Sequence, residues 1–479
     1  MAAKTFSLRI KSMYGCGDMF AGGAFLLIGL LFLNYLTDVV RLSPAMAGSV
    51  FMIGKVWDAV SDPLMGVLSD RTRSRFGRRR VYFLIGIFPI FFTFSMLWYS
   101  LNIESTFSKF IYYMIAYLLF NTVFTMVMIP YNSILPNMTT DYKERTSFVT
   151  VRLMFSSVSA ILSGVLPMLI VRSFGDRVTT GYFVMGVAFG VFYALPWIFV
   201  FKGTWESKYV EPKTSGTCGI YREFASAFKN RSFRLHTGFF VTAQTAVDFL
   251  TTLFIYYLTY CLLKGNLFSI VLGSLLIVQL MSMPLHMKIS RRLGKTAPLK
   301  VGLSVWIIAL LISLTLTPDS PVLLVFTVAA MSGIGSAASV FVPWSILPEI
   351  TDVDELITGR RREGIYSGMA TFIRKIAQAL SVFAIGIVLD LIGYVPDIQQ
   401  SDGAILGIKL LFALAPIAFI LLSLFFASRY RMTEEKHRII MEEIERRKRE
   451  KNPSTDEEVI ETCEELTGIA YDELCKKLL

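Results

Sequence analysis

The sequence has few charged residues for its length. Of its 479 residues only 17% are Asp, Glu, Lys or Arg, whereas roughly 25% is usual for a soluble domain. Hydrophobic residues make up 54% of the chain, and the mean hydropathy is +0.57. This balance excludes an ordinary soluble protein and predicts an all-α integral membrane protein.

Histidine and cysteine are scarce as well. The chain has 3 His and 5 Cys, and no two cysteines form a CxxC pair. Without such clusters the sequence indicates no zinc site, no disulfide scaffold and no catalytic triad. We therefore expect no enzyme activity and no bound cofactor.

Long apolar runs are abundant. A helix needs about 17 to 25 residues to cross a bilayer, and runs of that length recur twelve times. We expect an N-terminal six-helix bundle (1–201), a cytoplasmic linker (202–235), a C-terminal six-helix bundle (236–428) and a charged cytoplasmic tail (429–479). The expected spans lie near 18–40, 45–69, 81–101, 109–136, 147–171, 181–201, 236–262, 267–288, 298–317, 321–347, 365–393 and 404–428.

The two expected bundles repeat a short motif. IPYNSILP and VPWSILP share a proline and the run Ser-Ile-Leu-Pro, and their first prolines, Pro130 and Pro343, lie 213 residues apart. Two parallel six-helix halves are the simplest account of this repeat. Transporters of that architecture bind their substrate between the halves near the middle of the bilayer, so the repeat favours a carrier over a channel.

Basic residues gather in alternate connections. One side holds clusters around Arg75, Lys143, Arg292 and Arg361, while the opposite connections hold few basic residues. The positive-inside rule then places both termini in the cytoplasm, with the chain in the cell membrane. The net charge of +11 follows mainly from this topology, so we expect no nucleic-acid partner.

One expected span carries several charges. The stretch KVWDAVSDPLMG places Lys55, Asp58 and Asp62 on one helical face, because positions i, i+3 and i+4 are neighbours. A charge at the bilayer centre costs ~2.5–3.5 kcal/mol on insertion scales, so the carboxylates must face a cavity and bind something positive. That partner is either a cation from outside or an internal base.

The two candidate cations make different demands. Sodium prefers several oxygen ligands, and the hydroxyls of Ser61 and Thr125 could join the two carboxylates. A proton needs only one carboxylate. The alternative is that Lys55 or Lys375 pairs with the aspartates and merely holds the helices together.

Four segments carry a family resemblance. GVLSDRTRSRFGRRR is similar to the loop between the second and third helices of the major facilitator superfamily. YLTDVV, WDAVSDPLMG and IPYNSILP resemble, in order and spacing, the glycoside-pentoside-hexuronide:cation symporters, the family of the melibiose permease. The resemblance implies the major facilitator fold and alternating access. The loop residues to which it gives a gating role are Asp70, Arg71, Arg75 and Arg78.

The resemblance also implies a cation site. It assigns Asp58 and Asp62 to the coupling cation, sodium or a proton. Thr125 matches a family ligand, and Ser61 stands where the melibiose permease has an asparagine. No other metal ion is expected.

The sugar site is implied less completely. The resemblance assigns to it Asp18, whose carboxylate would accept from sugar hydroxyls, and Arg152, whose guanidinium would donate to them. Lys375 matches a family lysine near the cation site, and we count it among the sugar-binding residues. Local alternatives stay open: Asp18 suits a helix start, and Arg152 could snorkel to the cytoplasmic surface. Lys375, beside Arg374, could serve in helix packing or at the surface.

The sequence departs from the melibiose permease at two further sugar positions. Met128 replaces an acidic residue and Asn132 replaces a tryptophan on either side of the helix-four proline. The lost carboxylate leaves the cavity more positive, which favours a uronic acid over an α-galactoside. Tyr131 could supply a flat face for the sugar ring, although such an aromatic residue often serves packing alone.

The last 51 residues alternate acidic and basic side chains. EEKHRIIMEEIERRKREK predicts a solvated helix, and NPSTDEE after it predicts a turn and a helix start. A plain cytoplasmic extension is favoured over a docking or regulatory segment.

Together these observations predict a secondary transporter that takes up a glycoside, pentoside or hexuronide with sodium or protons. The expected partners are a sugar or sugar acid, a monovalent cation and the lipid bilayer, and we expect a monomer. An exporter or a carrier of lipid-like substrates could use the same fold. A membrane-embedded enzyme would need catalytic groups near a membrane face, and no such set stands out.

Overall fold

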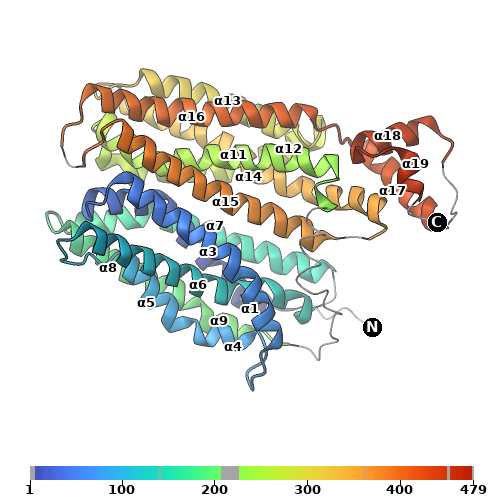
Figure 1. Cartoon of the computed structure of the whole chain (residues 1–479), viewed down its shortest axis with the longest axis horizontal. Helices are drawn as coiled ribbons and strands as arrows, with labels where there is room; N and C mark the ends of the chain where they lie inside the picture. The colour runs from blue at the N-terminus through green and yellow to red at the C-terminus, as the bar shows by residue number, and fades with distance from the viewer. Residues whose placement is uncertain are drawn as a thin grey trace.

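The computed structural model describes residues 6–139, 142–206, 226–360, 362–396, 398–449 and 454–476. In Figure 1 the helices of the first half lie below those of the second half, and most run along the long axis of the molecule. Between residues 8 and 429 the described part of the chain forms twelve consecutive rods, each a single helix or several helices in line. The all-α fold predicted from composition is confirmed.

The first half contains six rods, and the first of them changes from α-helix to π-helix in its later portion. The rods are α1 (Leu8–Gly15) with α2 (Asp18–Leu27), η1 (Ile28–Phe32) and η2 (Tyr35–Val39); α3 (Pro44–Arg71); α4 (Arg80–Ile85) with α5 (Ile87–Leu97); α6 (Thr106–Met138); α7 (Tyr142–Ser173); and α8 (Val178–Ala194) with α9 (Pro196–Gly203).

The second half repeats this plan, again with a π-helical segment late in its first rod. Its rods are α11 (Arg231–Tyr256) with η3 (Tyr257–Cys261); α12 (Phe268–Leu293), preceded by the short turn η4 (Gly265–Leu267); α13 (Ala297–Thr315); α14 (Val322–Thr358); α15 (Glu363–Leu391); and α16 (Asp402–Arg429).

Ten of these rods are long and apolar enough to cross a membrane. The other two are α3 and the pair α4–α5. The 28 residues of α3 extend about 42 Å at 1.5 Å per residue, enough to span, but they carry the charges expected of the cation site. Gly86 divides α4 from α5 and lies against α6, where an added Cβ would be 2.3 Å from Val127 Cγ2. The twelve-rod order agrees with the twelve spans expected from the sequence.

The two halves meet where α3 packs on α15 and where α7 packs on α12. Small residues make the first contact close. An added Cβ on Gly386 would lie 2.3 Å from the Pro44 carbonyl oxygen, and one on Gly48 would lie 3.0 Å from the Phe383 Cα. Close backbone approach of this kind is how membrane helices pack without a hydrophobic driving force. The contact brings the charged face of α3 against α15.

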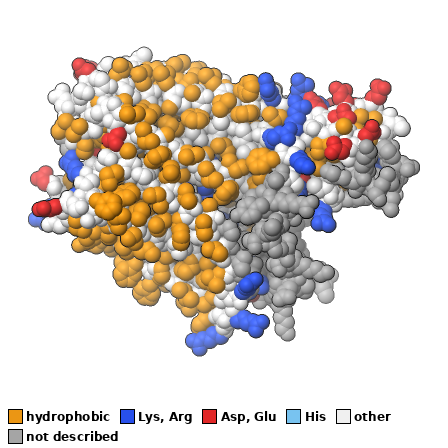
Figure 2. All heavy atoms as spheres, in the orientation of Figure 1, with side chains coloured by type: hydrophobic (Ala, Val, Ile, Leu, Met, Phe, Trp, Pro, Cys, Tyr) orange, Lys and Arg blue, Asp and Glu red, His pale blue; other side chains and the backbone are white. Residues whose placement is uncertain are grey.

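The outer surface fits a bilayer. Figure 2 shows hydrophobic side chains across the broad middle of the molecule, with Lys and Arg gathered toward one end. Many large apolar side chains are exposed on the molecule, among them Phe88, Met281 and Leu323. Such a wide apolar surface belongs in lipid, because a soluble monomer rarely exposes a patch of this size.

The tail differs from the sequence expectation. It forms α17 (Glu434–Arg449), α18 (Glu457–Thr467) and α19 (Tyr471–Lys476), and α17 and α18 pack against the second half. Ile440 and Ile444 on α17 are buried, as are Cys463 and Leu466 on α18. The prediction of a solvated helix was therefore wrong, because the few apolar residues of the charged segment form one stripe that faces a partner.

Polar contacts fix the docked tail. His437 lies 2.9 Å from an Asp352 carboxylate oxygen, and the Ser232 hydroxyl donates to the Leu466 carbonyl at 2.7 Å. The predicted start signal after the turn is confirmed, since the Asp456 side chain accepts from the backbone of α18 and caps the helix. Figure 1 shows the three tail helices together at one end of the second half.

Candidate functional site

Two carboxylates and two lysines form a cluster where the halves meet. Lys55, Asp58 and Asp62 share one face of α3, as their spacing predicts. The Lys55 ammonium donates to Asp58 Oδ2 at 3.0 Å. The Lys375 ammonium, on α15, donates to Asp62 Oδ2 at 2.6 Å and lies 3.8 Å from Asp58 Oδ2. The pair Asp62–Lys375 therefore joins the first half to the second.

The cluster has unused ligand atoms. The Thr125 hydroxyl, from α6, donates to Asp62 Oδ1 at 2.7 Å. Asp58 Oδ1 and the Ser61 hydroxyl are buried and have no hydrogen-bond partner within the described residues. A buried carboxylate oxygen and a buried hydroxyl both favour a hydrogen-bond or cation partner. The four cation-site residues expected from the sequence lie on two neighbouring helices: Asp58, Ser61 and Asp62 on α3, and Thr125 on α6.

The exposure of the two carboxylates differs. The Asp58 side chain is 4% exposed, whereas the Asp62 side chain is 27% and the Lys375 side chain 24% exposed. Solvent and ions can thus reach the outer pair first, and Asp58 lies behind it. Both lysines pair with the aspartates, as the alternative to a cation site expects.

Lys375 lies at the cation cluster, near the position that the resemblance implies for it. We also counted it among the sugar-binding residues, and here its ammonium binds the carboxylates of α3. Its neighbour Arg374 points to a different partner and forms two bonds of 2.7 Å with Asp248 on α11. Adjacent residues on a helix differ by about 100° in direction, so the two cations serve different carboxylates.

A second ion pair lies within the first half. The Arg152 guanidinium, on α7, donates from Nε to Asp18 Oδ1 at 2.8 Å, and its Nη2 lies 2.7 Å from the same oxygen. Its charged carbon lies 4.9 Å from the ring centre of Tyr131, in cation–π range. Tyr131 in turn stacks on Tyr14 with ring centres 4.8 Å apart. Asp18 is buried in this contact and is also the first residue of α2, so the helix-start position considered for it is observed together with the ion pair. The Arg152 guanidinium pairs with Asp18 and does not snorkel to the surface.

The remaining expected sugar residues are not all accessible. Met128 is 4% exposed and Tyr131 is fully buried, and both belong to the apolar core of the first half. Asn132, on the same helix, is exposed. In this conformation only Asn132 of the three could touch a ligand from solvent.

Sequence reasoning missed the carboxylate of Asp248. It is buried on α11, pairs with Arg374 and accepts a longer bond of 3.4 Å from the Gln378 side chain. Lys55, Asp248 and Gln378 all line one small central cavity of about 20 Å³. The available signal was a lone acidic residue in an apolar span, which by itself marks a functional candidate.

The charges of these clusters balance. Four cations stand against four anions, so their formal sum is zero. The cations are Lys55, Arg152, Arg374 and Lys375, and the anions are Asp18, Asp58, Asp62 and Asp248. Adding one monovalent cation would leave the site at +1, and adding a cation with a singly charged anion would leave it neutral.

The expected gating loop is tied to its own half. Arg71 ends α3, and the loop after it approaches Glu206, whose carboxylate accepts from the backbone of Arg78 at 3.0 Å and of Arg79 at 2.7 Å. The Arg75 guanidinium lies over the Phe76 ring. The side chain of Asp70 lies outside what the structure describes. Glu206 was not expected, because it follows the last helix of the half far along the sequence.

These features can be compared with known proteins. A family model described as MFS/sugar transport protein matches residues 13–434. The chain belongs to this family. It is a multi-pass symporter of sugars or glycosides and not an enzyme, and the resemblance to glycoside-pentoside-hexuronide:cation symporters is confirmed.

Known relatives agree with this assignment. The chain is 30% identical to the uncharacterized symporter YnaJ of Bacillus subtilis (strain 168), over 93% of this chain and 96% of the relative. It is 26% identical to the glucuronide carrier protein homolog of Escherichia coli (strain K12), over 91% and 95% of the two chains. A solved bacterial homolog of the lysosomal transporter Spinster, inward-facing and unoccupied, shares the fold at a TM-score of 0.62 and 13% identity, over 88% and 95%.

Proposed function

We propose that this transporter takes up a glycoside, pentoside or hexuronide together with sodium or a proton. The observation that carries the proposal is the bridge of Lys375 from α15 to the carboxylates of α3. It joins the proposed cation site to the interface between the halves, which is where substrate binding must be coupled to movement.

Competition between the lysine and the transported cation supplies the coupling. A sodium ion or proton on Asp58 or Asp62 removes the negative charge that holds Lys375. In this proposal the unpaired oxygen of Asp58 and the hydroxyls of Ser61 and Thr125 would serve as further oxygen ligands for sodium. Once the cation is bound, the ion pair between Lys375 on α15 and the carboxylates of α3 is weakened. The Lys375 ammonium can then bind another anion.

The sugar is proposed to bind at Asp18 and Arg152. In the absence of sugar they bind each other. A sugar hydroxyl can donate to the carboxylate and accept from the guanidinium, so it can enter this pair without leaving either charge unpartnered. Asn132, which is exposed nearby on α6, adds a neutral donor and acceptor.

We further propose that the preferred substrate is anionic. The clusters sum to zero charge, so a cation entering with a sugar acid keeps the site neutral, whereas a cation with an uncharged sugar leaves an extra positive charge in a weakly screened cavity. A glucuronide carries such a carboxylate. Met128, in place of an acidic residue, removes a charge that would repel it.

Counterflow in reconstituted vesicles tests the substrate class. We expect labelled uronates or other sugar acids to exchange faster than α-galactosides, and we expect cation-coupled uptake of a uronate to be insensitive to membrane potential. Met128→Asp is a poor test, because it would place a carboxylate in the apolar core. Efficient exchange of an α-galactoside with no exchange of any sugar acid would contradict the proposal. Active extrusion from loaded vesicles without uptake would favour the exporter.

The orientation is also a proposal. We expect both termini and the connections around Arg75, Lys143, Arg292 and Arg361 to face the cytoplasm, because basic residues accumulate there. Single cysteines at these positions should react with an impermeant maleimide only in opened cells. Labelling of positions 75 and 292 from opposite sides of intact membranes would contradict this map.

A further inference from the structure

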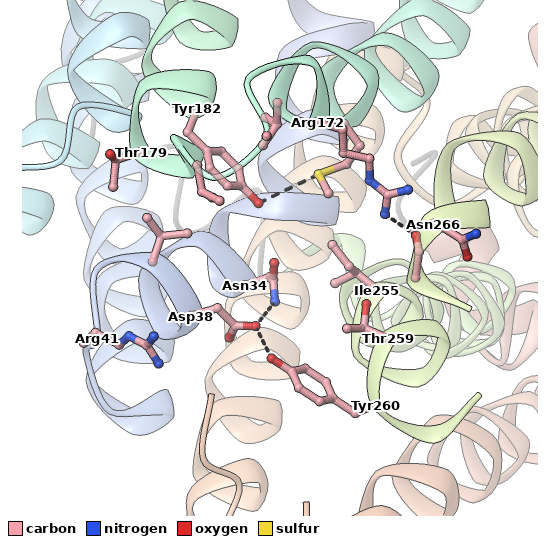
Figure 3. A pocket seen from close by; sticks show the side chains of 16 residues that line it. Asn34, Asp38, Arg41, Arg172, Thr179, Tyr182, Ile255, Thr259, Tyr260 and Asn266 are labelled. Atoms are coloured by element: carbon pink, nitrogen blue, oxygen red, sulfur yellow. Dashed lines mark hydrogen bonds between the residues drawn. The ribbon is translucent and has the colours of Figure 1, made fainter. Parts of the chain in front are cut away.

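The two halves are tied together at the end opposite the tail. There the partly buried Asp38 carboxylate accepts four hydrogen bonds, as Figure 3 shows in part. Tyr260 donates to Oδ2 at 2.6 Å and Tyr394 to Oδ1 at 2.6 Å, both from the second half. Thr37 donates to Oδ1 at 2.6 Å and Asn34 to Oδ2 at 2.8 Å. One carboxylate thus gathers donors from three segments.

The segments that meet here are an internal repeat. YLTDVV (35–40) and YLTYCL (257–262) occupy the same place in the first rod of each half, and Asp38 and Tyr260 stand at the same position of the motif. Each motif contains a π-helical segment, η2 in the first half and η3 in the second. Asp38 and Tyr260 are thus equivalent positions of the two halves, and they contact each other at the interface. The repeat therefore places an acceptor from one half directly against a donor from the other.

The backbone repeats as well. The backbone N–H of Val40 donates to the Tyr35 carbonyl, and that of Leu262 donates to the Tyr257 carbonyl. In both cases the acceptor lies five residues before the donor. The residue that follows each of these donors has positive φ: Arg41 at 69° and Leu263 at 52°. Among the described residues these are the two positive-φ positions that are not glycine. Left-handed non-glycine residues and π-helical turns are strained and concentrate at functional positions.

Neighbouring contacts close the same end. The hydroxyls of Thr37 and Tyr256 lie 2.9 Å apart across the halves, and the Arg172 guanidinium donates to the Gly265 carbonyl. Beside them lies a cavity of about 530 Å³, whose lining includes Asp38 and Tyr260 (Figure 3).

We propose that Asp38, Tyr260 and Tyr394 are the outer latch of the transporter. The three side chains position the halves in the outward-closed state and must separate when the outer side opens. A charged acceptor with phenolic donors suits this role, because such bonds are strong when buried yet can be exchanged for water when the cavity floods. The proposal rests on the transporter fold, on the orientation proposed above and on these contacts, and not on which sugar or cation is carried.

Spin-label distance measurements test the latch. Labels at Phe107 and Leu323, both exposed near the outer ends of α6 and α14, report the separation of the halves. Tyr260→Phe and Tyr394→Phe keep the rings and remove one donor each. We expect each to raise the ratio of outward-open to outward-closed molecules about tenfold, equivalent to about 1.4 kcal/mol, and the double variant to raise it further.

A matched control separates the latch from a general effect of losing a hydroxyl. Tyr112 also lies at this end, but its hydroxyl donates to the Met96 carbonyl within the first half at 3.0 Å. Tyr112→Phe should leave the distance distribution unchanged. The latch is overturned if the double variant of Tyr260 and Tyr394, purified as folded protein, gives the same distribution as Tyr112→Phe. Asp38→Asn should shift the distribution in the same direction as the double variant.

Discussion

Asp62→Asn is expected to lose accumulation of sugar against a gradient while keeping sugar-for-sugar exchange. The change removes the charge shared by Lys375 and, as proposed, by the transported cation. Coupling between two ligands is commonly worth ~1–3 kcal/mol, so the cation should tighten sugar binding by about 5- to 150-fold in the native protein. In Asp62→Asn this stimulation should be nearly absent. Uptake and exchange would be measured per folded carrier in vesicles. Asp58→Asn should act in the same direction.

One control variant and the yield of folded protein make this result specific. Glu349→Gln removes an ion pair with Lys295 in the second half, away from the cation cluster, and should leave coupling intact. If the aspartates are only structural, Asp62→Asn would strand Lys375 and lower the yield of folded protein, with all activities falling together. A well-folded Asp62→Asn carrier with normal accumulation and unchanged cation dependence would disprove the assignment.

Asp18→Asn is expected to weaken sugar binding itself and to leave the cation response of the remaining transport in place. The neutral amide keeps the size of the side chain, but it no longer offers a charged acceptor to the proposed sugar hydroxyl or balances the charge of Arg152. Losing a hydrogen bond to a charged group costs about 1.5–3 kcal/mol, so the concentration for half-maximal exchange should rise roughly 10- to 150-fold.

The partner residue supplies the comparison. Arg152→Lys keeps the positive charge but loses the two-bond contact with one carboxylate oxygen. It should weaken sugar binding less than Asp18→Asn, and both variants should keep their cation stimulation. If Asp18→Asn binds sugar normally but loses its cation stimulation, then Asp18 belongs to the cation site and the division between the two sites is wrong.

Much of the fold could be predicted because its signals are local. Hydropathy gave the spans, and a shared motif gave the two halves. On α3 the four-residue spacing of Asp58 and Asp62 was enough to place them on one face, since helix geometry alone decides it. Thr125 was expected from resemblance, and the structure places its hydroxyl on Asp62.

The parts that the sequence did not predict depend on contacts between distant segments. Whether Lys375 or Arg374 faces α3 depends on the rotation of α15, which no local pattern sets. Asp248 finds its partner 126 residues later in the chain. The tail was misjudged because the alternating charges of its first helix outnumber the apolar residues, and only the contact with the second half shows that Ile440 and Ile444 are buried.

The most direct test is the reciprocal effect of cation and sugar on each other's binding in the purified carrier. Once counterflow has identified a transported sugar, its affinity should be measured by calorimetry with and without sodium and across pH, in the native protein and in Asp62→Asn. The account predicts that the native protein binds sugar more tightly in the presence of one of these cations, and binds that cation more tightly by the same factor when sugar is present. It also predicts that Asp62→Asn binds sugar with no cation effect. Sugar binding that is independent of sodium and pH in the native protein, or equally cation-dependent in Asp62→Asn, would contradict it.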